Sequence, residues 1–195
     1  MHINWPLREL NLKVVYYGPA LSGKTTNLEQ IYAKMDPSRR SEMVSIKTHE
    51  DRTLYFDFLQ LELGRIGRLT PKIQLYTVPG QAYYEASRRL VLRGADGIVF
   101  VVDSDASRLA DNLESWRSML GHMRSLEINP DKIALVVQFN KQDLPTALSP
   151  TALRSLMRVS AYPCTLAVAF QGQGVLDTLK TITRGVMERV QRELA

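Results

Sequence analysis

The chain has 195 residues, enough for one compact domain with a full hydrophobic core. Hydrophobic residues make up 45% and charged residues 23%, which excludes a disordered chain and is ordinary for a globular protein. The net charge of +5 is spread along the chain, with Lys and Arg interleaved with Glu and Asp. Such a charge indicates a solvated, mildly basic surface, so we expect no nucleic-acid partner. The sequence has no internal repeat, low-complexity tract or linker-like break in composition, so we expect one domain over residues 1–195.

Targeting signals are not evident. The first residues, MHINWPLRELNLK, lack the apolar core of a signal peptide, and the final RELA carries no prenylation cysteine. The longest strongly apolar run, Ile98–Val102, is far shorter than the roughly 20 residues that a membrane helix needs. The single cysteine, Cys164, excludes an internal disulfide and fits a reducing compartment. We expect a cytoplasmic protein with no intrinsic membrane anchor.

Short apolar runs alternate with segments of helical period, which is typical of an α/β fold with helices on both faces of a mainly parallel sheet. The predicted strands, in chain order, are Leu12–Tyr17, Leu54–Leu63, Lys72–Thr77, Gly97–Asp103, Ile133–Phe139 and Cys164–Ala169. Gly64–Gly67 is predicted as the turn of a hairpin between the second and third strands. We expect this hairpin to be the only antiparallel pair in a sheet of about six strands.

Three helices stand out along the chain. A helical run over Thr25–Met35 follows the first strand. Apolar residues at steps of three and four predict two longer helices, one from Leu109 to Met123 and one from Val175 to Val190. Ser149 followed by Pro150 is typical of an N-cap and first helical residue. These stripes are interpreted as core and not as cofactor sites.

The strongest motif lies between the first strand and the first helix. Two glycines four residues apart precede Lys and Thr, in the segment Gly18-Pro19-Ala20-Leu21-Ser22-Gly23-Lys24-Thr25, which continues into Thr26. In a phosphate loop the glycines let backbone N–H groups converge on phosphate oxygens at a helix N-terminus. We expect Lys24 to neutralise the β- and γ-phosphates and the Thr25 hydroxyl to ligate Mg²⁺. The motif predicts a three-layer P-loop NTPase.

A second motif selects the base. Asn140-Lys141-Gln142-Asp143 directly follows the strand Ile133–Phe139. The Asp143 carboxylate can accept hydrogen bonds from guanine N1–H and the 2-amino group, whereas adenine offers an acceptor at N1. A charge-assisted bond contributes about 1.5–3 kcal/mol, so the motif favours guanine. We expect Asn140 to bond the other edge of the base and the stem of Lys141 to cover its face. GTP and GDP are therefore the predicted ligands.

With these motifs in place, the chain resembles Ras-like small GTPases (a Ras-like G domain) and, within them, the bacterial MglA family of polarity and gliding-motility GTPases. The similar stretches are VYYGPALSGKTTNL at 15–28, EDRTLYFDFL at 50–59, LYTVPGQAYYEASRRLVLRGADGIVFVVDS at 75–104 and NKQDLP at 140–145. The resemblance implies a GTP/GDP switch with slow hydrolysis in polarity or motility. It also implies a roadblock-fold homodimer of the MglB type as activator or exchange factor.

The resemblance assigns further residues to the site. Gly80 is expected to approach the γ-phosphate with its backbone N–H, and Gln81 to orient the attacking water. Thr53 is the expected second protein ligand to Mg²⁺, with Thr48 as an alternative. Arg52 resembles the built-in arginine finger of the family, and its alternative interpretation is an ordinary solvated loop arginine.

The base loop departs from the Ras-like pattern. Ala167-Val168-Ala169, followed by Phe170, stands where the family carries Ser-Ala-Lys beside the base. We expect Val168, Ala169 and Phe170 to contact the nucleotide, with the Ala169 N–H near guanine O6.

Two other departures leave the rate of hydrolysis open. Thr77 stands where Ras-like proteins carry an Asp that steadies the magnesium shell, and Ala20 stands where they usually carry Gly. One alternative to a hydrolysing switch is a GTP-binding interaction module with negligible hydrolysis. Another is a P-loop kinase or ATPase, against which the NKQD motif argues.

The expected centre of the partner surface consists of Tyr83, Tyr84 and Arg88, because aromatic and arginine residues are enriched at the centres of protein interfaces. The alternative is that both tyrosines pack into the core.

Overall fold

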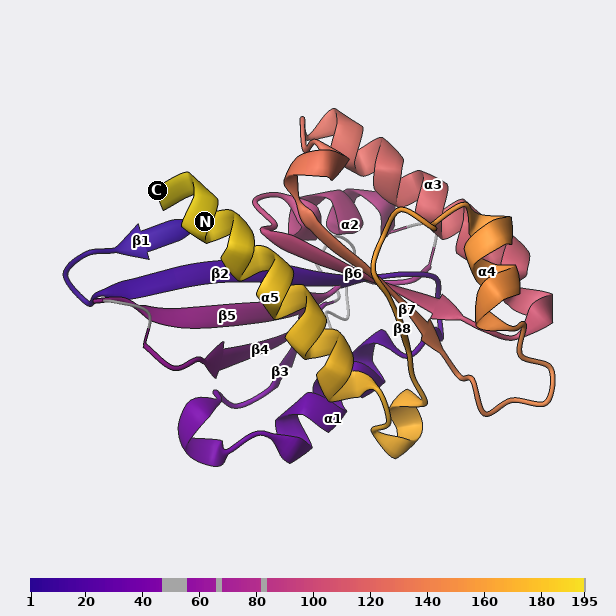
Figure 1. Cartoon of the computed structure of the whole chain (residues 1–195), viewed down its shortest axis with the longest axis horizontal. Coiled ribbons are helices and arrows are strands. Elements are labelled where there is room, and N and C mark those ends of the chain that lie inside the picture. The colour runs from indigo at the N-terminus through magenta and orange to yellow at the C-terminus, as the bar shows by residue number, and fades with distance from the viewer. Residues whose placement is uncertain (47–55, 66–67, 82–83, 195) are drawn as a thin grey trace.

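A computed structural model of the chain describes residues 1–46, 56–65, 68–81 and 84–194 (Figure 1). Within these residues eight strands form one sheet, in which seven follow the order β3-β4-β5-β2-β6-β7-β8 and β1 pairs with β2. The strands are β1 (His2–Asn4), β2 (Glu9–Tyr17), β3 (Val44–Ile46), β4 (Phe56–Glu62), β5 (Thr70–Thr77), β6 (Gly97–Asp103), β7 (Ala134–Asn140) and β8 (Cys164–Leu166).

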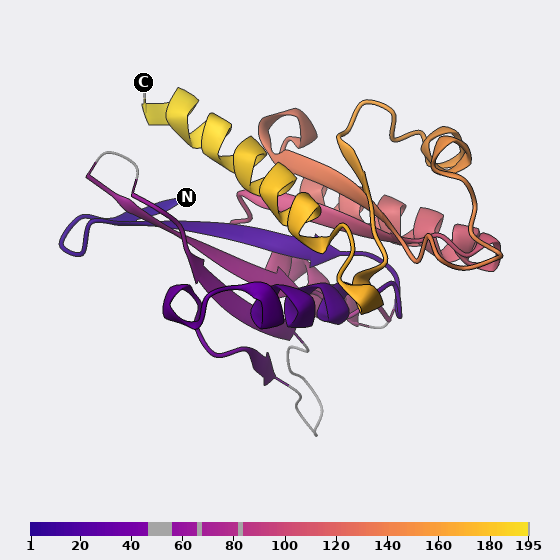
Figure 2. The same ribbon diagram turned by 60° about the horizontal axis from the view of Figure 1, so that its bottom comes forward.

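Five α-helices are described, in two layers on the sheet. They are α1 (Lys24–Lys34), α2 (Glu85–Leu92), α3 (Leu109–Ser125), α4 (Pro150–Met157) and α5 (Val175–Leu194). Helices α1 and α5 cover one face and α2, α3 and α4 cover the other (Figures 1 and 2). None of the described helices is long and apolar enough to cross a membrane.

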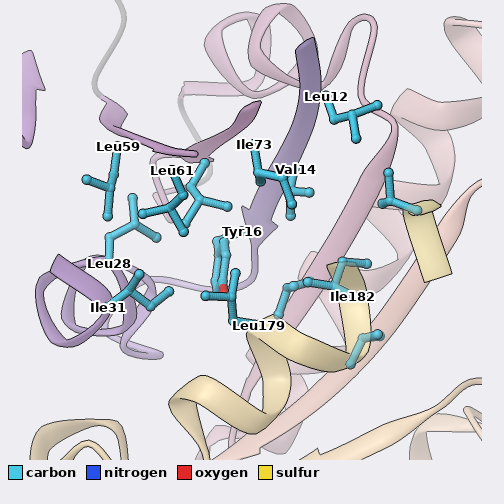
Figure 3. Packing of buried hydrophobic residues seen from close by; sticks show 14 of the residues in the cluster. Leu12, Val14, Tyr16, Leu28, Ile31, Leu59, Leu61, Ile73, Leu179 and Ile182 are labelled. Atoms are coloured by element: carbon cyan, nitrogen blue, oxygen red, sulfur yellow. The ribbon is translucent and has the colours of Figure 1, made fainter. Parts of the chain in front are cut away.

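Each face of the sheet has its own hydrophobic core. On the first face, alternate residues of β2 pack against α1 and α5, as Figure 3 shows for Leu12, Val14 and Tyr16 beside Leu28 and Ile182. The intervening residues of β2 face the second core, where Phe100 meets the edge of Trp116 with ring centroids 4.9 Å apart. The second half of β2 is therefore buried on both faces of the sheet. This burial fixes the position of the loop that follows Tyr17.

The predicted fold class is confirmed, with a correction to the strand pairing. The hairpin β4–β5 is antiparallel as expected, and β5, β2, β6, β7 and β8 are parallel. However, β1 and β3 were not predicted, and they add two further antiparallel pairs, with β2 and β4. The predicted strand Cys164–Ala169 ends at Leu166, because Ala169 begins a 3₁₀ turn. The predicted cap is present, since Ser149 Oγ accepts a hydrogen bond from Ala152 N at 3.2 Å.

Candidate functional site: a phosphate loop joined to a base loop

The phosphate loop connects β2 to α1 at the carboxyl edge of the parallel strands (Figure 1). Gly23 has φ +96, and a Cβ built there would lie 2.3 Å from Asn140 Nδ2. Leu21 also has positive φ, 64°, and its side chain is exposed. Ser22 is fully buried, while Thr26 is half-buried in the first turn of α1. The loop therefore has the tight backbone path that the glycine spacing predicts.

The side chain of Lys24 lies inside this loop. Its Nζ donates to the carbonyl oxygens of Gly18 at 3.1 Å and Pro19 at 2.6 Å. Burial lowers the pKa of Lys24 to about 7; the nearby charge of Arg88 lowers it further, and that of Asp57 opposes the shift. An anion near Nζ would favour the protonated form. The lysine is thus placed to exchange carbonyl oxygens for phosphate oxygens.

A buried carboxylate that sequence reasoning missed lies beside the loop. Asp57, on β4, accepts hydrogen bonds through Oδ2 from the hydroxyls of Thr25 at 2.6 Å and Thr77 at 2.8 Å. Its Oδ1 accepts a third from Ser45 Oγ at 2.7 Å. Thr77 Oγ1 in turn accepts from Asp57 N at 2.8 Å. The carboxylate absent at position 77 is therefore supplied from the neighbouring strand.

The segment after β5 approaches the phosphate loop closely. A Cβ built on Gly80 would lie 2.4 Å from Ala20 Cα, so only glycine fits this contact. Gln81 is exposed, and with Ala20, Lys24 and Thr25 it lines a hollow of about 390 Å³. The same hollow is bordered by Asp57 and Thr77. It brings a cation, two hydroxyls, a carboxylate and an amide into one space.

The base loop is attached to the phosphate loop by Asn140. Its Nδ2 donates to Ser22 O at 2.8 Å, and its Oδ1 accepts from Ala169 N at 2.8 Å. Both ends of the amide are thus engaged with backbone groups of two loops. The contact of Asn140 with the base stays a prediction, and its structural role is to hold the two loops at a fixed separation.

The other residues predicted to contact the base lie in two segments, 141–143 and 168–170. Lys141 has φ 64°, and its Nζ forms an ion pair with the buried Asp103 at 2.6 Å. The Asp143 side chain is exposed. In the neighbouring segment, whose Ala167 O accepts from Gln142 N at 3.2 Å, Val168 and Ala169 are buried and the Phe170 side chain is exposed. Both segments follow neighbouring parallel strands, β7 and β8, and so lie at the same edge of the sheet.

An arginine not singled out in the sequence also reaches the phosphate loop. Arg108, just before α3, donates from Nη2 to Ala20 O at 3.0 Å. Its Nη1 pairs with Asp111 at 2.5 Å, and its Nε lies 3.9 Å from Asp103. Arg108 thus links the phosphate loop with the carboxylate that holds Lys141. Its position before a helix carries no local signal, so the sequence could not have indicated it.

Several predicted residues fall outside the described part of the chain: Arg52, Thr53 and Thr48 in segment 47–55, and Tyr83 in segment 82–83. Tyr84 is half-buried. The expectation that Arg88 forms part of an exposed partner surface was wrong, because its side chain is only 5% exposed and faces the inside of the molecule from α2.

Similarity to known proteins extends over nearly the whole chain. The sequence matches the ADP-ribosylation factor family over residues 4–188. The mutual gliding-motility protein MglA of Myxococcus xanthus is 44% identical over 190 residues, which cover 97% of each protein. The Ras-related protein Rab-7a of Dictyostelium discoideum is 28% identical over 137 residues, 70% of this chain and 62% of that protein. The chain therefore belongs to the ADP-ribosylation factor family of Ras-like small GTPases, within its MglA group, and it is a GTP-hydrolysing switch.

Proposed function

We propose that the chain, acting as a single G domain over residues 1–195, reads guanine through Asp143 and holds the phosphates with loop 18–25. The observation that carries this assignment is the amide of Asn140, which donates to Ser22 O and accepts from Ala169 N, each at 2.8 Å. Because one side chain joins the phosphate loop to the base loop, a single ligand can span both. A nucleoside phosphate with guanine at one end has that shape.

The test is competition between nucleotides. GTP should displace a fluorescent GDP analogue, while ATP at equal concentration should not. Asp143→Asn should lose GTP affinity by at least about tenfold, because one charge-assisted bond contributes about 1.5–3 kcal/mol, and it should gain affinity for xanthosine triphosphate. The matched control is Asp131→Asn, which removes the same charge from an exposed carboxylate before β7. Equal competition by ATP would contradict the assignment of the base loop.

The residues beside Lys24 also fit Mg²⁺. Hard oxygen donors suit this ion, which usually keeps several waters and takes one or two protein ligands beside substrate phosphates. Thr25 would supply a hydroxyl ligand and Thr53 is the proposed second one, while Asp57 would supply negative charge near the metal-bound waters. When bound, the ion supplies positive charge to the β- and γ-phosphate oxygens. The buried Asp57 carboxylate, which accepts from Thr25 Oγ1 at 2.6 Å, supports this fit.

For the chemical step, we assign water orientation to Gln81 and transition-state charge stabilisation to Arg52. Gln81 supports this role by lining the hollow that also contains Lys24 and Thr25. The role assigned to Arg52 is based on the family resemblance alone. Because such an arginine acts mainly in the transition state, Arg52→Ala should lower partner-stimulated kcat by about a hundredfold or more, with GTP affinity within a few-fold.

A second candidate is a GTP-binding interaction module with negligible hydrolysis. The observation that favours it is the close approach of Gly80 to Ala20, where an extra methyl stands beside the space that Gln81 lines. Single-turnover hydrolysis of bound GTP, with and without a partner, separates the two functions. Turnover that a partner does not raise above background would support the module.

We further propose a cytoplasmic role in cell polarity or motility, with a roadblock-fold homodimer of the MglB type as activator or exchange factor. One named relative, MglA, is a gliding-motility protein. The burial of Arg88 moves the proposed docking surface to the exposed side of α2, which carries Glu85, Ala86, Arg89 and Leu90. Of these, Glu85 lines one hollow together with Gln81. Capture of such a homodimer should depend on the nucleotide. Equal capture with GDP and with a non-hydrolysable GTP analogue would count against docking at the switch.

A further inference from the structure

Two large apolar side chains are exposed together at the turn between β1 and β2. Trp5 is 70% exposed and Leu7 is 64% exposed, two residues apart in the turn Trp5-Pro6-Leu7-Arg8. The other tryptophan, Trp116, is only 7% exposed in the core. Scattered exposed leucines are normal, but a tryptophan and a leucine at the same turn form a local apolar surface that calls for an explanation.

The turn is braced, so the exposure of these side chains is built into the hairpin. Arg8 N donates to Trp5 O at 3.2 Å, and Leu7 N donates to Asn4 Oδ1 at 3.4 Å. Pro6 occupies the second position of this turn, where its fixed φ is favourable. Arg8 closes it with φ 53°, a conformation that is uncommon for residues other than glycine. The hairpin therefore holds Trp5 and Leu7 at its tip.

Basic residues gather around this apolar tip. Arg8 O accepts from Thr70 N at 2.8 Å, so the β1–β2 turn lies beside the β4–β5 connection, and both lie at the same end of the sheet in Figures 1 and 2. Arg8, Arg65 and Arg68 are exposed there. In the part of the chain that the structure describes, no carboxylate pairs with any of the three.

The acidic groups nearby do not cancel this charge. Glu9 is neutralised by Lys72, whose Nζ lies 2.5 Å from its Oε1. Glu62, at the end of β4 and opposite Lys72 in the sheet, is the exposed acidic counterpart. The three arginines therefore leave a positive excess around Trp5 and Leu7. We call Trp5, Leu7, Arg8, Arg65 and Arg68 the double-turn tip.

We propose that the double-turn tip makes a shallow, reversible contact with an anionic lipid surface. Tryptophan favours the headgroup level of a bilayer, and arginines near the surface are attracted by anionic lipids. The tip is a projecting turn, which can enter an interface as a wedge, and its arginines complement the negative headgroups. Because the phosphate loop follows the opposite end of β2, this orientation leaves the nucleotide edge of the sheet turned away from the lipid (Figure 1).

The test uses the fluorescence of Trp5 in the full chain loaded with GDP. The chain has two tryptophans, so Trp116→Phe makes Trp5 the only one. We expect its emission to shift to the blue on vesicles of phosphatidylcholine with phosphatidylserine, and not on phosphatidylcholine alone. The shift should diminish as salt is raised, because salt screens exposed charges. An unshifted emission on the anionic vesicles would overturn the proposal and leave a protein as the occupant of the tip.

Variants measured by co-sedimentation separate the tip from the rest of the surface. Trp5→Ser with Leu7→Ser should reduce binding to anionic vesicles by about tenfold or more, since each apolar side chain loses its buried area. Arg8→Gln with Arg65→Gln should remove the preference for phosphatidylserine. Leu156→Ser, at an exposed leucine on α4, is the matched control and should bind as the parent chain does. All variants should keep GDP affinity, and undiminished vesicle binding by the double serine variant would also overturn the proposal.

Discussion

The carboxylate of Asp57 lies against the hydroxyl of Thr77, with Oδ2 and Oγ1 2.8 Å apart, across the antiparallel pair β4 and β5. The same oxygen accepts from Thr25 at 2.6 Å. Thr77, the last residue of β5, thus has a negatively charged neighbour although it carries no charge itself. In the Ras-like pattern the carboxylate stands at the position of Thr77 itself, whereas here it comes from β4.

We expect Asp57→Asn to raise the Mg²⁺ concentration needed for tight GTP binding by about tenfold. The substitution keeps the shape but removes a charge whose hydrogen bonds contribute about 1.5–3 kcal/mol each. The measurement is GTP-analogue affinity across a Mg²⁺ titration. Glu62→Gln removes a carboxylate from the exposed end of the same strand and should leave the titration unchanged. An identical Mg²⁺ dependence in both variants would remove Asp57 from the metal site.

The contacts of Asp57 join residues that are far apart in the sequence. The phosphate loop and NKQD could be predicted because each is a contiguous motif whose chemistry depends on local backbone shape. Asp57 could not, because its partners at positions 25, 45 and 77 depend on the register that pairs Phe58 with Tyr76 and Ser45 with Asp57. The one signal was an acidic residue within the apolar run Tyr55–Leu59.

The missed elements have a similar cause. β1 and β3 have three residues each, too few for a period of two to be recognised. The burial of Arg88 was missed because a charged residue on a short helix is usually solvated. By contrast, the long helices α3 and α5 lie close to their predicted positions, because their apolar stripes extend over several turns.

The lowered pKa of Lys24, about 7, predicts a pH-dependent affinity. Phosphate favours the charged lysine, so binding above pH 7 must take up a proton, and GDP affinity should fall by up to about tenfold per pH unit. GDP affinity should be measured between about pH 7.5 and 8.5, because the nucleotide phosphates are already ionised in this range. Calorimetry in two buffers of different ionisation enthalpy should detect the uptake of nearly one proton. A pH-independent affinity would contradict the lowered pKa of Lys24.

The stability of the unliganded chain should respond to Lys24 with the opposite sign. The unfolded lysine keeps its ordinary pKa of 10.5, so the unfolded state binds more protons than the folded state between about pH 7 and 10.5. The contribution of Lys24 to folding stability therefore rises with pH through this window, while the affinity for GDP falls. Opposite slopes in the two measurements distinguish this lysine from a general loss of structure at alkaline pH.

Asn140→Ala should destabilise the GDP-loaded chain by about 1–3 kcal/mol, because it leaves the buried carbonyl of Ser22 and the N–H of Ala169 without a side-chain partner. Each kcal/mol lowers the unfolding midpoint by about 2–4 °C for a chain of this size. Asn129→Ala, at an exposed residue whose side chain accepts from Asp131 N, is the control for losing an asparagine. Equal shifts in both variants would argue against a loop-joining role for Asn140.

The last prediction concerns the methyl group of Ala20. The backbone of Gly80 approaches this residue so closely that a Cβ on Gly80 would lie 2.4 Å from Ala20 Cα, and Gln81 lines the same hollow. Removing the methyl should give the Gln81 amide and the attacking water more room in the transition state. We therefore expect Ala20→Gly to raise single-turnover GTP hydrolysis by about tenfold, with little change in GTP affinity, because the gain arises only during reaction.

Gln81→Leu supplies the comparison. It should lower hydrolysis and leave GTP affinity within a few-fold, and it should abolish the gain when combined with Ala20→Gly. If Ala20→Gly accelerates hydrolysis equally with Leu at position 81, the methyl acts on the phosphate loop itself. If the rate does not change at all, the slow step lies elsewhere, and the absence of glycine at position 20 has no bearing on whether this chain is a switch or an interaction module.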